Sequence, residues 1–305
     1  MTLALQLAIA GLATGSVYAL IAIGVVLIYK CSGVVNFAQG AYAMAGGYAT
    51  YALLAAGLPR LAAVLLSMAI LAGLGALTER LILRPMLKAP VVAVMMATLG
   101  ILIFARAACL AIWGPDQIAF PALFPAGAVN AGGLYITYNY IAAGVLAAGL
   151  SLAFLAFYRF TPMGLQQRCA AENGRAALAI GIHVSNQVSA AWAMSAALAG
   201  LAGTLLATLN GISLGLADIG MLAFPVIVVG GLSSLGGALV AGLLLGMLQS
   251  FTDGWLTPTL EDWLRAHTSI DSVGALQQVV PYALLVLMLL VRPQGLFGRR
   301  GTERV

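Results

Sequence analysis

Residues 5–29 read LQLAIAGLATGSVYALIAIGVVLIY, a mainly apolar stretch without a charged side chain. An α-helix rises about 1.5 Å per residue, so this stretch could cross a hydrocarbon core of about 30 Å. Period-2 alternation is absent, which favours helices over barrel strands. Further apolar windows follow at 34–57, 61–83, 90–113, 138–158, 184–209, 221–250 and 277–291.

The composition supports a membrane protein. Of 305 residues, 62% are hydrophobic and 8% are charged, whereas soluble domains carry about 25% charged residues. Too few polar side chains remain to cover a water-facing surface. No long charged or Pro/Ser-rich linker interrupts the apolar runs. We therefore predict an all-α fold: one polytopic transmembrane helical bundle over 1–305, with about eight spans and a broken or re-entrant segment near 221–250.

The charges predict an orientation in the membrane. The net charge is +5, but the basic residues lie in short loops between spans, so the positive-inside rule explains them better than nucleic-acid binding. An external amino terminus and a cytoplasmic carboxyl terminus satisfy this rule. The cytoplasmic basic residues are then Lys30, Arg80, Arg84, Lys88, Arg159, Arg168, Arg175, Arg292, Arg299, Arg300 and Arg304, and the external acids are Asp116, Asp218, Asp253, Glu261, Asp262 and Asp271.

Two apolar segments are interrupted. Asp218 and Asp253 must both lie outside, which a single crossing over 221–250 cannot achieve, and GGLSSLGG at 230–237 divides that segment. A second interruption follows Lys30. Gly-interrupted segments in both halves of a chain indicate a translocation path, although a tight turn and packing glycines are equally compatible with the pattern. The candidate path residues are Asn36, Gln39, Gly40, Gly230, Gly231, Ser233 and Ser234.

Small residues also recur at the four-residue spacing that lets helices approach closely in lipid. Gly11 with Gly15 and Gly242 with Gly246 have this spacing, and Gly46 and Gly47 form a pair. These glycines predict tight helix packing.

The polar residues provide little for catalysis. Of the two histidines, His183 lies at a cytoplasmic helix entrance and His267 in an external loop. Neither can serve Ser233 or Ser234 as a base inside the membrane, which argues against intramembrane hydrolysis. No His/Cys/Glu grouping has zinc-ligand spacing, which predicts no metal site. No glycine precedes Lys30 or Lys88 as a phosphate-binding loop requires. We predict a protein that is not an enzyme and whose energy comes from a partner.

The longest cytoplasmic loop, 159–183, has helix signals. Pro162 can open one short helix and Gly181 can end a second. Between them lie a small apolar face and several charges. Such a surface suits insertion into a groove of a cytoplasmic protein; the alternative is a solvated amphipathic connector.

Four segments of the sequence resemble those of a known protein family. GLATGSVYALIAIG at 11–24, GVVNFAQG at 33–40, FPVIVVGG at 224–231 and RPQGLFG at 292–298 are similar to segments of the LivH/LivM family of branched-chain amino acid ABC transporter permeases. The opening is of the LivH type. In that family the loop contacts the ATPase, and the matching residues here are Arg168, Glu172, Asn173, Gly174, Arg175 and Gly181.

The resemblance implies a pore-forming subunit in the bacterial inner membrane, in contact with membrane lipid. Its expected partners are a second related permease, two cytoplasmic ATP-binding subunits and an external solute-binding protein. ATP is bound by the partners, so no cofactor is expected on this chain. The solute would be a branched-chain amino acid or a similar small polar solute, since members also serve urea and amides. The alternative is a self-sufficient channel or facilitator.

Overall fold

The computed structural model describes residues 2–86, 89–125, 127–131, 134–267, 276–292 and 294–298. Six residues named above lie outside these ranges: Lys88, Asp271, Pro293, Arg299, Arg300 and Arg304.

The described chain is helical throughout, apart from loops and one small hairpin, which confirms the predicted all-α class. Antiparallel strands β1 (Ala128–Ala131) and β2 (Leu134–Thr137) form the hairpin. The helices are α1 (Thr2–Ser32), α2 (Gln39–Ala55), α3 (Arg60–Thr78), α4 (Val91–Trp113), α5 (Tyr138–Phe160), α6 (Pro162–Glu172), α7 (Gly174–Ala179), α8 (Val184–Asn210), α9 (Ile219–Gly230), α10 (Leu235–Phe251), α11 (Thr257–His267) and α12 (Leu276–Val291). The short turns are η1 (Glu79–Leu83), η2 (Arg84–Met86), η3 (Leu214–Asp218) and η4 (Thr252–Leu256).

Six helices of the described chain are long and apolar enough to cross a membrane. They are Leu3–Ser32, Arg60–Met86, Val91–Trp113, Tyr138–Phe160, Val184–Asn210 and Leu235–His267. The remaining predicted windows correspond to shorter helices, namely α2, the segment Leu214–Gly230 and α12. The last long helix continues from α10 into α11 because the π-helical turn η4 joins them.

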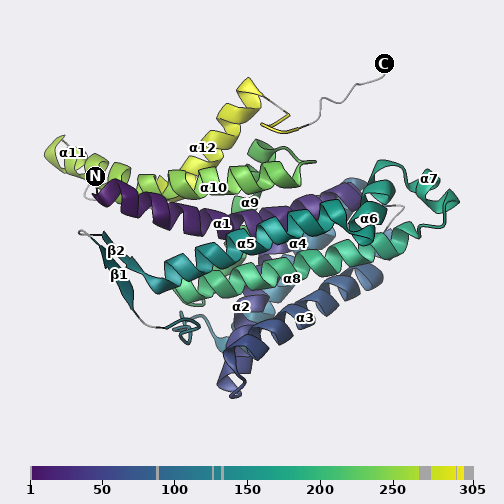
Figure 1. Cartoon of the computed structure of the whole chain (residues 1–305), viewed down its shortest axis with the longest axis horizontal. Coiled ribbons are helices and arrows are strands. Elements are labelled where there is room, and N and C mark those ends of the chain that lie inside the picture. The colour runs from purple at the N-terminus through teal and green to yellow at the C-terminus, as the bar shows by residue number, and fades with distance from the viewer. Residues whose placement is uncertain are drawn as a thin grey trace.

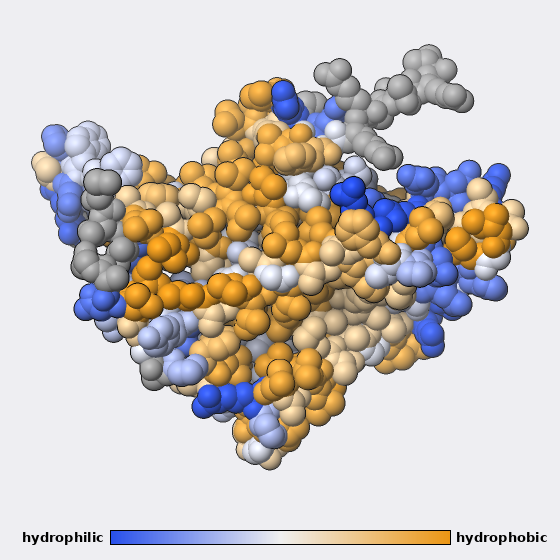
Figure 2. All heavy atoms as spheres, viewed as in Figure 1, coloured by the Kyte–Doolittle hydropathy of each residue, from blue (hydrophilic) through white to orange (hydrophobic). Residues whose placement is uncertain are grey.

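Helix α1 lies at the centre of the bundle, between α10 and α5 (Figure 1). In its most apolar window 83% of the residues are buried, compared with 11% in α4. Exposed side chains of α4 include Ile103 and Phe104, which would be unfavourable in water but face lipid in a membrane. Apolar side chains cover the middle of the surface, while hydrophilic residues gather at the α11 end and the α6–α7 end (Figure 2).

Close glycine contacts hold the bundle together. A Cβ on Gly246 of α10 would overlap the Cα atom of Gly15 on α1, and one on Gly46 of α2 would overlap the Cα atom of Gly200 on α8. The glycines at this spacing lie in the contact between α1 and α10, in agreement with the predicted tight helix packing. Packing of this kind stabilises helix pairs in lipid, where the hydrophobic effect between helices is absent.

The segment 221–250 is divided as the sequence indicated. Helix α9 ends at Gly230, a turn follows, and α10 begins at Leu235. Ser233 and Ser234 in the turn share a pocket with Lys30 near the end of α1, while the far end of α10 lies at the start of α1, where Ser250 Oγ donates to the Leu7 carbonyl. The turn therefore lies near the α6–α7 end of the bundle, and the β-hairpin, α11 and the amino terminus lie at the opposite end (Figure 1).

Candidate functional site

The break between α1 and α2 buries two amide side chains. Gly33 has a φ of +69°, a conformation that favours glycine, and it turns the chain out of α1. Asn36 is 1% exposed and Gln39 is fully buried. Asn36 Oδ1 accepts a hydrogen bond from the Ala38 N–H at 2.9 Å, and Asn36 Nδ2 donates to Gln39 Oε1 at 3.2 Å. The side chain of Asn36 thus shapes the start of α2.

Gln39 joins this break to α8. Its Oε1 atom also accepts from Ser195 Oγ at 3.0 Å, and its Nε2 atom donates to the Ser195 carbonyl at 3.2 Å. Helix α1 also packs against Gln39 at Gly24, because a Cβ on Gly24 would lie 2.5 Å from Gln39 Nε2. We call Asn36, Gln39 and Ser195 the amide cluster. It concentrates donors and acceptors where α1, α2 and α8 meet.

Gly40 lies in a helix contact next to this cluster. A Cβ on Gly40 would overlap the Ala217 carbonyl and lie 3.0 Å from the Cα atom of Gly220. The absence of a side chain therefore lets α2 approach the start of α9. Among the predicted path residues, the structure brings Asn36 and Gln39 into direct contact and places Gly40 beside them.

The break between α9 and α10 is covered by the carboxyl-terminal segment 294–298. Gly231 has a φ of +97° and ends α9. The freed carbonyls of Val229 and Gly230 accept hydrogen bonds from the N–H groups of Leu296 at 2.8 Å and Phe297 at 3.2 Å. Carbonyls at a helix end that lack a partner are costly in a membrane, so this segment satisfies them.

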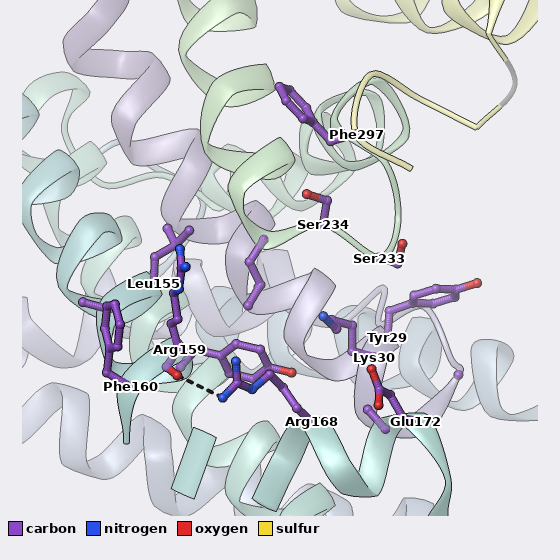
Figure 3. Close-up of a pocket in the computed structure, with 15 residues that line it drawn as sticks. Tyr29, Lys30, Leu155, Arg159, Phe160, Arg168, Glu172, Ser233, Ser234 and Phe297 are labelled. Carbon is purple, nitrogen blue, oxygen red and sulfur yellow. Dashed lines mark hydrogen bonds between the residues drawn. The ribbon is translucent and has the colours of Figure 1, made fainter. Parts of the chain in front are cut away.

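Ser233 and Ser234 have a different environment. Ser234 caps α10, since its Oγ atom accepts from the Gly237 N–H at 3.0 Å. Both serines line a pocket of about 940 Å³ that Arg168 and Glu172 also line. Figure 3 shows the two serines on one side of this pocket and Arg159, Phe160 and Arg168 on the other. The structure thus joins the α9–α10 turn to helix α6, whereas neither Asn36 nor Gln39 lines this pocket.

The loop 159–183 folds as two short helices, as the sequence predicted, and the structure shows that a side chain caps each of them. Thr161 Oγ1 caps α6 by accepting from the Gly164 N–H at 3.1 Å, and Pro162 occupies the first turn. Asn173 caps α7, since its Oδ1 atom accepts from the N–H groups of Arg175 and Ala176, each at 3.1 Å. Because these caps are made within the loop, its shape is defined without a partner.

Helix α7 carries an exposed surface at the end of the bundle. Gly174 is its first residue, and Gly181, with a φ of +85°, turns the chain away beyond its end. Leu178 is 58% exposed and Ile180 is 71% exposed. On α6, Arg168 bends back to donate to the Arg159 carbonyl at 2.9 Å. The loop therefore presents apolar side chains on α7 and places the Arg168 charge towards the bundle.

Sequence reasoning missed a buried ion pair. Glu79, at the end of α3, is 3% exposed and contacts Arg84 at 3.1 Å. Its carboxylate also accepts from Ser189 Oγ of α8 at 2.5 Å. The five-residue spacing of Glu79 and Arg84 becomes a contact because η1 is a π-helical turn. This pair links α3 to the start of α8, directly after the loop.

A second missed pair lies toward the other end of the bundle. Arg106 is the one charged residue well inside an apolar window of the sequence, away from its ends. Its Nη1 atom lies 3.0 Å from Asp218 Oδ1, at the start of α9. The positions of these residues in the sequence carry no signal for the contact, since 111 residues separate them.

In the described ranges, no group of three or more His, Cys, Asp or Glu side chains is arranged to hold a metal ion. The polar side chains of the amide cluster and of the pocket carry amides, hydroxyls, cations and a single carboxylate, that of Glu172.

Comparisons with known proteins agree on one family. Residues 7–289 match the model of the permease component of branched-chain amino acid transport systems. The chain is 30% identical to the high-affinity branched-chain amino acid transport system permease protein LivH of Escherichia coli K12, covering 97% of this chain and 96% of that protein. It is 31% identical to the corresponding BraD of Pseudomonas aeruginosa, covering 99% and 98%. No solved structure matches.

Proposed function

Because this chain belongs to the family of branched-chain amino acid transport permeases, we propose that it is the membrane-spanning subunit of an ATP-driven importer. It would translocate a branched-chain amino acid or a similar small polar solute that an external binding protein delivers. The observation that carries this proposal is the family match over residues 7–289, which includes both helix breaks and the α6–α7 loop.

The solute path is assigned to the helix breaks. Asn36, Gln39 and Ser195 offer donors and acceptors that suit an amino group and a carboxylate. Gly40, Gly230 and Gly231 permit the close backbone contacts around the breaks, and Ser233 and Ser234 form the inner end of the path. The solute drives alternating access only if the outward and inward states bind it with different affinity, and rearrangement of the amide cluster provides that difference.

The α6–α7 loop is assigned to ATPase coupling. Its capped helices form a rigid projection, and the exposed Leu178 and Ile180 suit an apolar groove. Arg168, Glu172, Asn173, Gly174, Arg175 and Gly181 give this projection its charge and shape. ATP then binds to two cytoplasmic partner subunits, and a second related permease completes the pore.

The loop must then face the cytoplasm. The amino terminus of α1 lies at the opposite end of the bundle (Figure 1), so the proposal places it outside the cell membrane. Arg159, Arg168 and Arg175 lie at or near the loop end, in agreement with the positive-inside rule.

Gentle purification of the tagged chain from its native membrane tests the assembly. We expect a related permease and ATP-binding subunits to accompany it, as identified by mass spectrometry. Leu178→Asp should remove the ATP-binding subunits, because it places a charge in an apolar contact. Val129→Glu, which alters an exposed position of the hairpin at the opposite end, is the matched control and should retain them.

The alternative hypothesis, a self-sufficient channel or facilitator, predicts a different outcome. A folded chain that purifies alone, and that gives ATP-independent leucine flux in proteoliposomes, would contradict the importer proposal.

A further inference from the structure

The pocket beside α6 is strongly basic. Its lining includes the cations Lys30, Arg159 and Arg168 and the carboxylate Glu172. The formal charge of the lining is therefore +2. The amino-terminal end of α10, with its positive dipole end, also borders the pocket at Ser234 and Leu235. These features favour an anion.

Two buried polar atoms at the pocket have no hydrogen-bond partner among the described residues: Tyr158 Oη and Arg168 Nε. Tyr158 is only 5% exposed. Lys30 Nζ lies 5.3 Å and Arg168 Cζ 5.9 Å from the centre of its ring. Buried polar groups are nearly always paired in folded proteins. Both atoms belong to side chains that line the pocket and both are hydrogen-bond donors, which suits a ligand that carries several acceptor oxygens.

Two exposed aromatic side chains form the apolar part of the pocket rim, and the pocket lies at the ends of two spans. Lys30 is near the end of α1, and Arg159 and Phe160 are the last residues of α5. Phe160 is 76% exposed and Phe297 is 53% exposed, and both line the pocket (Figure 3). A charged base and an aromatic rim at the membrane boundary suit a ligand with an anionic head and hydrocarbon chains.

We propose that this pocket binds the phosphate headgroup of an anionic phospholipid from the leaflet on the α6–α7 side. Lys30, Arg168 and the Tyr158 hydroxyl contact the phosphate, and the acyl chains lie against Phe160 and Phe297. Basic pockets between transmembrane helices are suited to such headgroups. A free phosphate would satisfy the same cations but would leave the apolar rim exposed. The inference rests on the pocket alone, so it holds whether the chain is an importer or a channel.

Native mass spectrometry of the full-length chain, delipidated in detergent, tests the site. The probes are phosphatidylglycerol and the zwitterionic phosphatidylethanolamine. We expect phosphatidylglycerol to bind more tightly, and Lys30→Gln and Arg168→Gln each to weaken its binding about fivefold. Tyr158→Phe removes only the hydroxyl and should also weaken phosphatidylglycerol binding. If a charge variant fails to fold, this variant still tests whether the lipid binds in the pocket. The control Arg292→Gln removes an exposed cation outside the pocket and should have no effect.

Three results would overturn the proposal. The first is equal phosphatidylglycerol binding by the wild type, the pocket variants and the control. The second is inorganic phosphate binding as tightly as the lipid, which would make the pocket a site for a free anion. The third is displacement of the lipid by leucine, which would extend the solute path from Ser233 and Ser234 to the cations Lys30 and Arg168.

Discussion

At the scale of single residues, the most consequential side chains are buried polar ones. Glu79 is enclosed by Arg84 and Ser189, and Gln39 makes hydrogen bonds in both directions with Ser195. A buried polar group that loses its partner keeps its desolvation penalty without compensation. Removing one partner therefore lowers the free energy of unfolding more at these buried sites than at the surface.

Glu79→Gln should lower the free energy of unfolding by about 1–3 kcal/mol, since hydrogen bonds to a charged group are lost. Thermal unfolding in detergent measures the change. Glu261→Gln is the control, because the Glu261–Arg265 pair at 3.7 Å is more exposed, and such pairs contribute about 0.5 kcal/mol or less. Equal effects of the two changes would contradict a special role for Glu79.

Gln39→Leu should abolish solute uptake while the protein still assembles with its partners, because the amide cluster loses its shared acceptor. Uptake of labelled leucine into cells, with membrane abundance measured in parallel, checks this. Gln249→Leu is the matched control. It removes another buried amide, one that bonds the Gln277 carbonyl at 3.2 Å away from the cluster, and should leave uptake intact. Normal uptake by the Gln39 variant would exclude it from the path.

At the scale of elements, glycine contacts and helix breaks set the architecture. Gly15 and Gly246 let α1 and α10 approach along their lengths, and Gly230 meets Gly237 across the α9–α10 turn. The segment 294–298 then satisfies the carbonyls that the turn exposes. Helix α9 can therefore end within the bundle with the Val229 and Gly230 carbonyls hydrogen-bonded.

Gly246→Leu should push α10 away from α1 and destabilise the protein by about 1–3 kcal/mol or more, as overpacking does. Gly73→Leu provides the comparison, since a Cβ at Gly73 of α3 meets no atom within 4 Å. The melting temperature and membrane yield of both variants report the difference. A Gly73 variant that is as unstable as the Gly246 variant would refute the packing argument.

At the scale of the whole molecule, the proposed function depends on the separation of two ends. One end holds the amino terminus, the β-hairpin and α11, and the other holds α6 and α7 (Figure 1). Between them, α4 and α3 present mainly apolar side chains to the surrounding lipid. The proposed coupling across this distance requires helices that move as units, and the contacts of Glu79 with Arg84 and Ser189 join α3 to α8.

Cysteine labelling should reveal the proposed orientation. With Cys31, Cys109 and Cys169 replaced by alanine, Val129→Cys should react with a membrane-impermeant maleimide in intact spheroplasts. Ile180→Cys should react only in inside-out vesicles. Both positions are exposed, so both should react after detergent treatment, which is the control. The reverse pattern would place the amino terminus inside.

The amino-acid sequence by itself determined the fold class, the approximate spans, the division of 221–250 and the two short helices of the loop. These features depend on local properties, namely apolar run length, glycine and proline positions, and capping residues within a few positions of each other. The glycine spacing of α1 and α10 was likewise visible because it repeats within one turn of a helix.

Only the tertiary structure decided which polar groups meet. Gln39 with Ser195, Arg106 with Asp218 and Glu79 with Ser189 are all contacts between residues more than 100 positions apart in the chain. It also showed that Ser233 and Ser234 share a pocket with Arg168 rather than with Asn36. Such contacts depend on how whole helices pack, and helix packing in lipid is set by shape complementarity over many residues, which no local pattern encodes.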